Sequence, residues 1–288
     1  MTTPPLHLSI GGITFALTPV DERLTLRIEG PLRHFRSEPV DAEVQLNVRA
    51  LERALPVEGE LLFDSGAVWR LFQRPDGFRI DCTSELFGPE PYKVATFDPT
   101  FTRGEVAIRT DALGREVDPL DYPLDEVLVS NLLGRGRGVE LHSCGVIDRE
   151  GRGHLFVGVS GAGKTTTARI WGDDALVVSD DRVIVRSVNQ EFRMYGTPWH
   201  GEARLCSPES APLAGVYLLR QAPETRLRSL DAAEAVARLF SCTFPLFHDA
   251  TALTFTLGIL ADLVRSVPVR ELQFTPDRTV LDAIASGV

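Results

Sequence analysis

The stretch that decides the fold of this chain is Gly158-Val-Ser-Gly-Ala-Gly-Lys-Thr-Thr166, which completes the pattern G-x-x-x-x-G-K-[ST]. Glycines let successive backbone N–H groups turn onto phosphate oxygens, the lysine reaches the β- and γ-phosphates, and the hydroxyl reaches Mg²⁺. We therefore expect ATP and Mg²⁺ to bind here. The expected nucleotide-binding residues are Gly158, Ser160, Gly161, Ala162, Gly163, Lys164, Thr165 and Thr166, with Thr165 also on the metal.

The residues on either side of this loop agree with it. His154–Gly158 has the pattern of a short buried strand, and Thr165–Trp171 that of a helix whose N-terminus would face the phosphates. Lysine is also rare, because Lys93 and Lys164 are the two lysines among 30 Lys and Arg residues. An ammonium at Lys164 is therefore expected to be a chemical requirement, since a compact charge fits among phosphates where a planar guanidinium does not. Lys93 is expected to be a solvated strand residue.

Composition limits the class of protein. The 288 residues predict one large or two ordinary domains, and the net charge of -10 argues against a nucleic-acid partner. The sequence contains no long apolar run, and the N-terminus lacks the features of a signal peptide, so we expect no membrane partner and a cytoplasmic location. The four cysteines are far apart and form no C-x-x-C pair, which favours reduced thiols and argues against a zinc site.

The hydrophobic pattern changes near residue 118. Residues 1–118 contain short alternating runs such as Ala42–Val48, which predict an all-β, antiparallel N-terminal domain. Residues 119–288 are expected to form an α/β domain of the P-loop type. Its first helix should begin near Pro123, bury one apolar face and end at a cap at Gly134. The residues of that face are Leu124, Val127, Leu128 and Leu132.

A second chemical feature is the hydrophobic strand Leu176–Val185, which two adjacent carboxylates, Asp180 and Asp181, interrupt. Unpaired buried charges are costly, so a cation or a substrate hydroxyl would explain them. Neighbouring strand residues point to opposite faces. One carboxylate would therefore coordinate Mg²⁺ and the other would accept the proton of an attacking hydroxyl. The alternative is a strand end with two solvated carboxylates.

A third feature, the segment Tyr195–Arg204, gathers Gly, Pro and aromatic residues around His200 and Glu202. This composition indicates a shaped loop beside a site, but a loop with a packed Trp199 and an exposed His200 would have the same pattern. The two interpretations stay open on this segment alone.

The order of these motifs resembles that of the HPr serine kinases and their kinase-related relatives, which share a phosphoenolpyruvate carboxykinase-like P-loop fold. The resemblance covers about residues 119–288, is strongest from Val139 to Arg204, and implies a P-loop α/β kinase domain. It implies that His142 lies near the γ-phosphate and the catalytic carboxylate. It further implies catalytic roles for Asp180, as the base, and Lys164, and metal contacts for Thr165, Asp181 and Glu202.

This chain also departs from that family. It has Thr165-Thr166 where the HPr enzymes carry Ser-Glu, and no counterpart of the C-terminal segment associated with phosphorylase activity is found. The expected function is transfer of the γ-phosphate of ATP to an acceptor hydroxyl on a protein, a peptide or a small molecule. An assisting arginine could be Arg220, Arg226 or Arg228. A nucleotide-binding regulatory protein and a simple NTPase are the alternatives, and self-association is left open.

Overall fold

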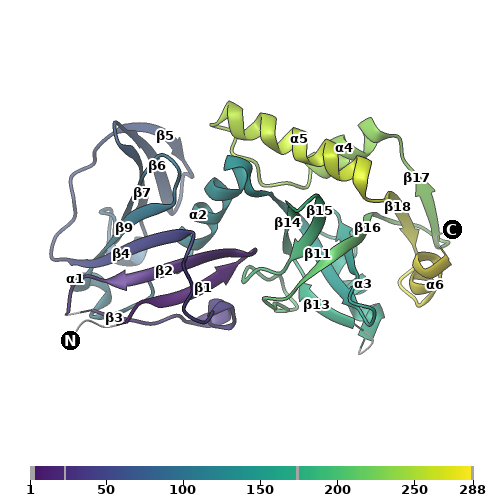
Figure 1. Cartoon of the computed structure of the whole chain (residues 1–288), viewed down its shortest axis with the longest axis horizontal. Helices are drawn as coiled ribbons and strands as arrows, with labels where there is room; N and C mark the ends of the chain where they lie inside the picture. Colours follow the sequence, from purple (N-terminus) through teal and green to yellow (C-terminus); the bar gives the residue numbers. More distant parts are fainter. Residues whose placement is uncertain (1–3, 23, 173–174, 287–288) are drawn as a thin grey trace. The chain divides into compact units, whose positions relative to one another are not determined.

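The computed structural model describes residues 4–22, 24–172 and 175–286 and divides the chain into two compact units, Met1–Leu132 and Leu133–Val288. The predicted boundary near residue 118 lies before helix α2 (Leu124–Leu132), which belongs to the first unit (Figure 1). Its predicted apolar face is buried, as expected. The helix does not end at a Gly134 cap, because a π-helical turn continues over Leu133–Arg137 and the positive φ falls at Gly136.

The first unit is built mainly from strands. In chain order its elements are β1 (Leu6–Ile10), β2 (Ile13–Pro19), β3 (Thr25–Leu26), a 3-10 helix (Gly30–Phe35), β4 (Val44–Leu51), β5 (Glu60–Asp64), β6 (Trp69–Arg74), β7 (Gly77–Cys82), a 3-10 turn (Glu85–Phe87), β8 (Lys93–Phe97), β9 (Arg103–Arg109), α1 (Thr110–Leu113), β10 (Glu116–Val117) and α2.

The large sheet of this unit is mixed, so the expected antiparallel domain is wrong in part. Its order is β1-β2-β4-β9-β8-β7-β6-β5, in which β2–β4 and β4–β9 are parallel pairs. The consecutive strands from β5 to β9 are antiparallel neighbours, whereas β2 reaches β4 through a long connection that contains the Gly30–Phe35 turn. A parallel partner requires such a crossover, and strand periodicity does not report it.

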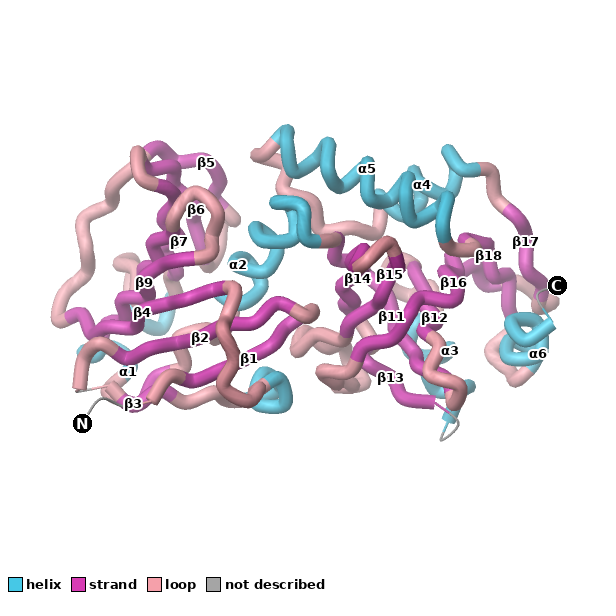
Figure 2. The backbone as a smooth tube through the Cα atoms, in the orientation of Figure 1, coloured by secondary structure: helices cyan, strands magenta, loops and turns pink. Residues whose placement is uncertain are grey.

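The second unit also contains more strand than helix. Its elements are β11 (Val139–Asp148), β12 (Gly153–Val157), α3 (Lys164–Trp171), β13 (Ala175–Ser179), β14 (Arg182–Val188), β15 (Glu191–Tyr195), β16 (Ser210–Gln221), β17 (Arg226–Ser229), α4 (Ala232–Phe240), α5 (Ala250–Ser266), β18 (Val269–Phe274) and α6 (Thr279–Ser286). Figure 2 shows the strands as the continuous centre of this unit.

Five strands of this unit close into a ring, and this finding overturns the expected P-loop α/β kinase domain. The order β12-β11-β14-β15-β16 is closed by a pairing of β16 with β12. Most neighbours in the ring are antiparallel, because hairpins rather than crossover helices join β11 to β12 and β14 to β15. A parallel sheet with a helix after each strand does not form, although α3 does follow β12 through the glycine loop.

The strands bury side chains on both faces. On β12, Leu155 and Val157 join a core with helices α4 and α5, whereas Phe156 between them joins a second core with α3 and α6. This alternation is the period of two expected for a strand. Figure 1 shows α4 and α5 together, away from α3 and α6. The glycine loop therefore starts from a strand that is packed on both sides.

Candidate functional site

The glycine loop has the backbone shape that a phosphate site needs. Gly161 has a φ of 80° and Gly163 a φ of 107°, both in the region that favours glycine. A Cβ on Gly163 would also lie 2.5 Å from Cζ of Phe274. Because Gly163 is the N-cap of α3 and has no side chain, the first N–H groups of the helix are left for a ligand.

Three polar side chains from separate segments meet beside this loop. Lys164 Nζ lies 2.8 Å from His142 Nε2, and the same ring nitrogen lies 3.0 Å from Asp181 Oδ1. The topology explains the meeting, because His142 pairs with Arg182 across β11 and β14, and its carbonyl oxygen accepts from the Gly158 N–H. His142 thus lies between the start of the loop and the carboxylate pair.

One ring nitrogen cannot accept from Lys164 and donate to Asp181 at the same time. With a proton on Nε2, His142 donates to Asp181, and Lys164 donates to the Gly158 carbonyl oxygen at 3.0 Å. Without that proton, Nε2 accepts from Lys164. The Lys164 ammonium has three donors, and it also donates to the Val159 carbonyl oxygen at 3.4 Å, so its bond to His142 depends on the tautomer while the two backbone bonds do not.

Charge and burial shift the pKa values of Asp181 and Lys164. The hydrogen bond from His142 lowers the pKa of Asp181, and the positive charges of Lys164 and Arg182 act in the same direction against burial. Burial lowers the pKa of Lys164, while the carboxylate of Asp181 opposes that shift. Asp181 is consequently an ionised carboxylate at neutral pH, and it faces the loop lysine.

Asp180 has a different environment from its neighbour. Its residue is 2% exposed, and its two oxygens accept backbone N–H groups of the next loop, from Gly201 at 2.9 Å, Ala203 at 2.9 Å and Leu205 at 3.3 Å. A Cβ on Gly201 would lie 2.9 Å from Asp180 Oδ2, so the loop approaches closely. The predicted base thus holds the 201–205 loop, and Asp181 is the carboxylate beside Lys164.

The predicted metal residues are not all together. Among the described residues, no group of three His, Cys, Asp or Glu side chains could enclose a metal ion. Glu202 is exposed on the loop that Asp180 holds, while Thr165 and Thr166 lie in the first turn of α3. Mg²⁺ is commonly held by one or two protein oxygens together with substrate phosphates and water. Thr165 and Asp181 are of the right type for such a site.

One charged neighbour was missed in the sequence. Arg182 Nη1 donates to Glu140 Oε1 at 3.2 Å, its Nε lies 3.6 Å from Asp181 Oδ2, and its guanidinium lies over the Phe244 ring. Its position directly after the carboxylate pair was the available signal. The arginines considered earlier have other partners, since Arg220 and Arg228 pair with Glu271, and Arg226 donates to Gln273.

Comparison with known proteins does not identify a family for this chain. No protein-family profile matches the chain, and no curated protein sequence matches it.

All four cysteines are free thiols. In the described part of the chain, none of the helices has the length and apolar character needed to cross a membrane.

Proposed function

We propose that the Leu133–Val288 unit transfers the γ-phosphate of ATP to the hydroxyl of an acceptor. The observation that carries this proposal is the meeting of Lys164, His142 and Asp181 at the glycine loop. The loop supplies N–H groups and a cation for phosphates, and the carboxylate supplies a proton acceptor. Phosphoryl transfer needs these two parts in one place, because its catalysis is mostly positioning and charge stabilisation.

The nucleotide phosphates would lie on the N–H groups between Ser160 and Thr166 other than that of Ala162, which donates to the Val159 carbonyl oxygen at 3.1 Å. Lys164 would turn from His142 to the β- and γ-phosphates. Mg²⁺, when bound with the nucleotide, would neutralise charge on the phosphate oxygens. Thr165 is the proposed protein ligand of that ion. Gln221, which donates to the Gly161 carbonyl oxygen at 3.0 Å, would keep the loop in place.

Asp181 is the proposed proton acceptor. The acceptor oxygen would form a bond to the γ-phosphorus as the bond to the β-phosphate oxygen breaks, and the hydroxyl proton would pass to Asp181. A carboxylate of lowered pKa is a weak base, which suits a late proton transfer in a loose transition state. His142 would position Asp181 by donating from Nε2. Asp180 is assigned to holding the 201–205 loop because three N–H groups already occupy its oxygens.

The test is incubation of the full chain with γ-labelled ATP, Mg²⁺ and a fractionated lysate of the source cell. We expect label on a protein, peptide or small molecule, and a much slower appearance of label with the Asp181→Asn variant. Label released only as inorganic phosphate would instead identify an NTPase. Nucleotide binding without turnover would identify a regulatory protein. The free thiols and the use of ATP agree with a cytoplasmic location for this activity.

A further inference from the structure

The loop that Asp180 holds borders the carboxylate of the proposed site. Gly201 is the first residue of this loop to donate to Asp180, and a Cβ on Gly201 would lie 3.2 Å from Cβ of Asp181. The loop then turns, because the Arg204 N–H donates to the Gly201 carbonyl oxygen at 3.2 Å. The Cα atoms at the two ends of such a turn lie less than about 7 Å apart. Arg204 therefore starts close enough to Asp181 for its long side chain to reach the space beside that carboxylate.

Arg204 has a backbone conformation that few side chains adopt. Its φ is 56°, in the left-handed region that favours glycine. Asp180 fixes this geometry, since the N–H groups on either side of Arg204, those of Ala203 and Leu205, both donate to its carboxylate. Residues held in such strained conformations cluster at active sites. Glycine would suit this backbone better, so the turn itself does not account for an arginine here.

The guanidinium of Arg204 has no partner within the part of the protein that the structure describes. Arg204 is exposed, and among the described residues its side chain makes no hydrogen bond, ion pair or ring contact. By contrast, Arg220, Arg226 and Arg228 all have protein partners. A side chain without such a partner can turn to a bound substrate without losing a protein contact.

The charge of the transferring phosphate gives this guanidinium a role. In phosphoryl transfer, negative charge spreads over the oxygens of the transferring group, and an arginine that contacts these oxygens raises the rate. Lys164 would supply one positive charge from the glycine loop. Arg182 is less suited to supply a second, because it donates to the buried carboxylate of Glu140. Arg204 extends from the loop beside Asp181, and no protein carboxylate among the described residues pairs with it.

We propose that Arg204 is a catalytic residue of this site, and that its guanidinium contacts the oxygens of the γ-phosphate during transfer. This inference rests on the proposed function and adds a residue to it. The bonds that form and break are those already assigned to the transfer, and Arg204 keeps its protons and its charge throughout. Lys164 and Arg204 would then hold the γ-phosphate from the glycine loop and from the side of the acceptor.

The test uses ADP·Mg with aluminium fluoride, which mimics the transferring phosphate and needs no identified acceptor. In calorimetric titrations of the full chain, aluminium fluoride should raise the affinity of the wild type for ADP·Mg. In Arg204→Met this gain should be about ten- to hundredfold smaller, as expected for a lost charge-assisted contact, and the affinity for ADP·Mg alone should be unchanged.

Equal gains in the wild type and in Arg204→Met, or no gain in a wild type that binds ADP·Mg, would overturn the role of Arg204. A wild type that binds no ADP·Mg would contradict the proposed function itself, and this inference would fall with it.

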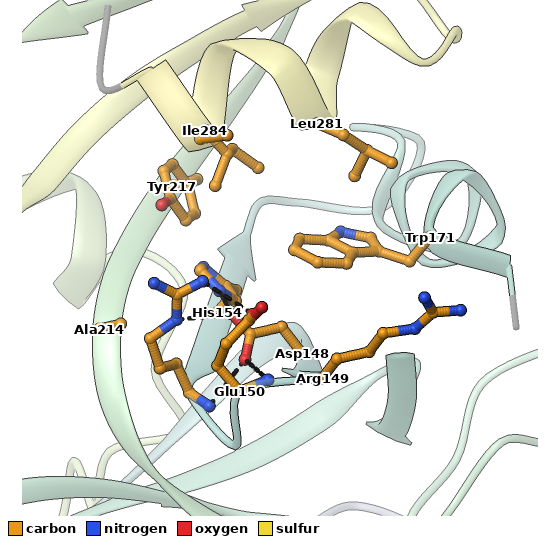
Figure 3. A pocket seen from close by; sticks show the side chains of 11 residues that line it. Asp148, Arg149, Glu150, His154, Trp171, Ala214, Tyr217, Leu281 and Ile284 are labelled. Carbon is orange, nitrogen blue, oxygen red and sulfur yellow. Dashed lines mark hydrogen bonds and ion pairs between the residues drawn. The ribbon is translucent and has the colours of Figure 1, made fainter. Parts of the chain in front are cut away.

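Arg149→Met is the matched control. Arg149 is an exposed arginine of the same unit, in the turn after β11, and it lines a pocket that contains no residue of the proposed site (Figure 3). This variant should keep the full gain from aluminium fluoride. A gain that falls equally in Arg149→Met and Arg204→Met would reflect general loss of positive charge and would contradict the assignment.

Arg204→Gly provides a second, independent measurement, because glycine fits the left-handed backbone and should keep the fold. With γ-labelled ATP and the fractionated lysate, its rate of transfer should be about 10³-fold below that of the wild type. Added guanidinium ion at millimolar concentration should restore part of this rate, which a purely structural role of Arg204 would not allow. A wild-type rate in Arg204→Gly, or a lowered rate that guanidinium does not raise, would overturn the proposal.

Discussion

Asp180 and Asp181 are neighbours in the chain with opposite surroundings, and this difference sets their roles. Asp180 accepts three backbone N–H groups from one loop, while Asp181 faces His142 and the loop lysine. The expected single strand Leu176–Val185 is wrong at this point, because Asp180 and Asp181 form the bend between β13 and β14, so the alternation of strand residues does not apply to them. Which of the two faces the site depends on how the 201–205 loop folds back, and local sequence does not report that.

We predict that Asp181→Asn lowers the rate of phosphate transfer by about 10²–10⁴, because it removes the proton acceptor. The affinity for ATP·Mg should change little, since the loop is untouched. Rates and titrations on the same samples check this. A variant that transfers phosphate at the wild-type rate would remove Asp181 from the mechanism.

The variant Asp180→Asn is the matched control for Asp181→Asn, and we expect it to lower the stability of the fold. An amide keeps one acceptor oxygen and turns an NH₂ group toward a backbone donor, so the free energy of unfolding should fall by about 1–3 kcal/mol. Urea unfolding measures this. If Asp180→Asn is as stable as the wild type but cannot transfer phosphate, the two roles must be exchanged.

The two lysines show what the sequence could and could not predict about single residues. The scarcity of lysine singled out Lys164, which is buried in the glycine loop beside His142, and its role toward phosphates stays a prediction. Lys93 was expected to be solvated, and this is wrong: it is fully buried on β8 and donates to the side chain of Asp121 and to the Asp118 carbonyl oxygen. These partners lie more than twenty residues away, so the strand pattern around Lys93 gave no sign of them.

At the scale of elements, one buried carboxylate ties a helix and two strands together. Glu271 on β18 accepts from Arg238 on α4 at 2.6 Å and from Arg228 on β17 at 3.1 Å, and Gln273 donates to it at 2.6 Å. Its side chain is 3% exposed. Burial acts to raise its pKa, but hydrogen bonds from Gln273, Arg238 and Arg228 prevail and lower that pKa to about 2.

This shift predicts a loss of stability in acid. Because the pKa is lower in the folded chain than its ordinary value of 4.5, ionised Glu271 stabilises the fold above pH 4.5. That contribution, about 3 kcal/mol, should disappear as the pH falls toward 2. Urea unfolding at a series of pH values would show a flatter profile for Glu271→Gln than for the wild type. The exposed Glu191→Gln should keep the wild-type slope, and a wild-type slope in Glu271→Gln would contradict the assignment.

Elements with a strong local pattern could be located from the sequence. Helix α2 and its buried face follow from apolar spacing, and the strand, glycine loop and helix from β12 to α3 follow from the loop motif. The end of α2 could not be located from the sequence, because Gly134 allows close packing and does not cap the helix. A Cβ there would lie 3.0 Å from side chains of Leu246 and Ala252. A glycine needed for packing and one needed for a cap are identical in sequence.

At the scale of the whole chain, strand pairing separates the expected fold from the observed one. The ring of the second unit closes where β12 pairs with β16, between residues about sixty positions apart. Periodicity marks each strand but not its partner or direction, so the α/β expectation followed the loop motif alone. Among the described residues, the two buried clusters of the second unit consist of Val139 and later positions, which gives this unit a core of its own.

That organisation predicts that a chain beginning at Leu133 folds and binds ATP·Mg. All residues of the proposed site lie after this point, and the described members of the buried clusters beneath them lie at Val139 or later. Thermal unfolding and a nucleotide titration of the shortened chain test it. A cooperative, folded product that fails to bind nucleotide would show that the first unit contributes to the site.

The most direct test of nucleotide binding at the glycine loop is a calorimetric titration of ATP·Mg into the full wild-type chain and into Lys164→Met. Methionine keeps the apolar stem of the lysine and removes its charge, so packing around the loop is preserved. We predict one nucleotide per chain in the wild type. Affinity should fall about ten- to hundredfold in the variant, as expected for the loss of a charge-assisted contact. Equal affinities, with both proteins folded, would contradict the assignment of this loop as the phosphate site.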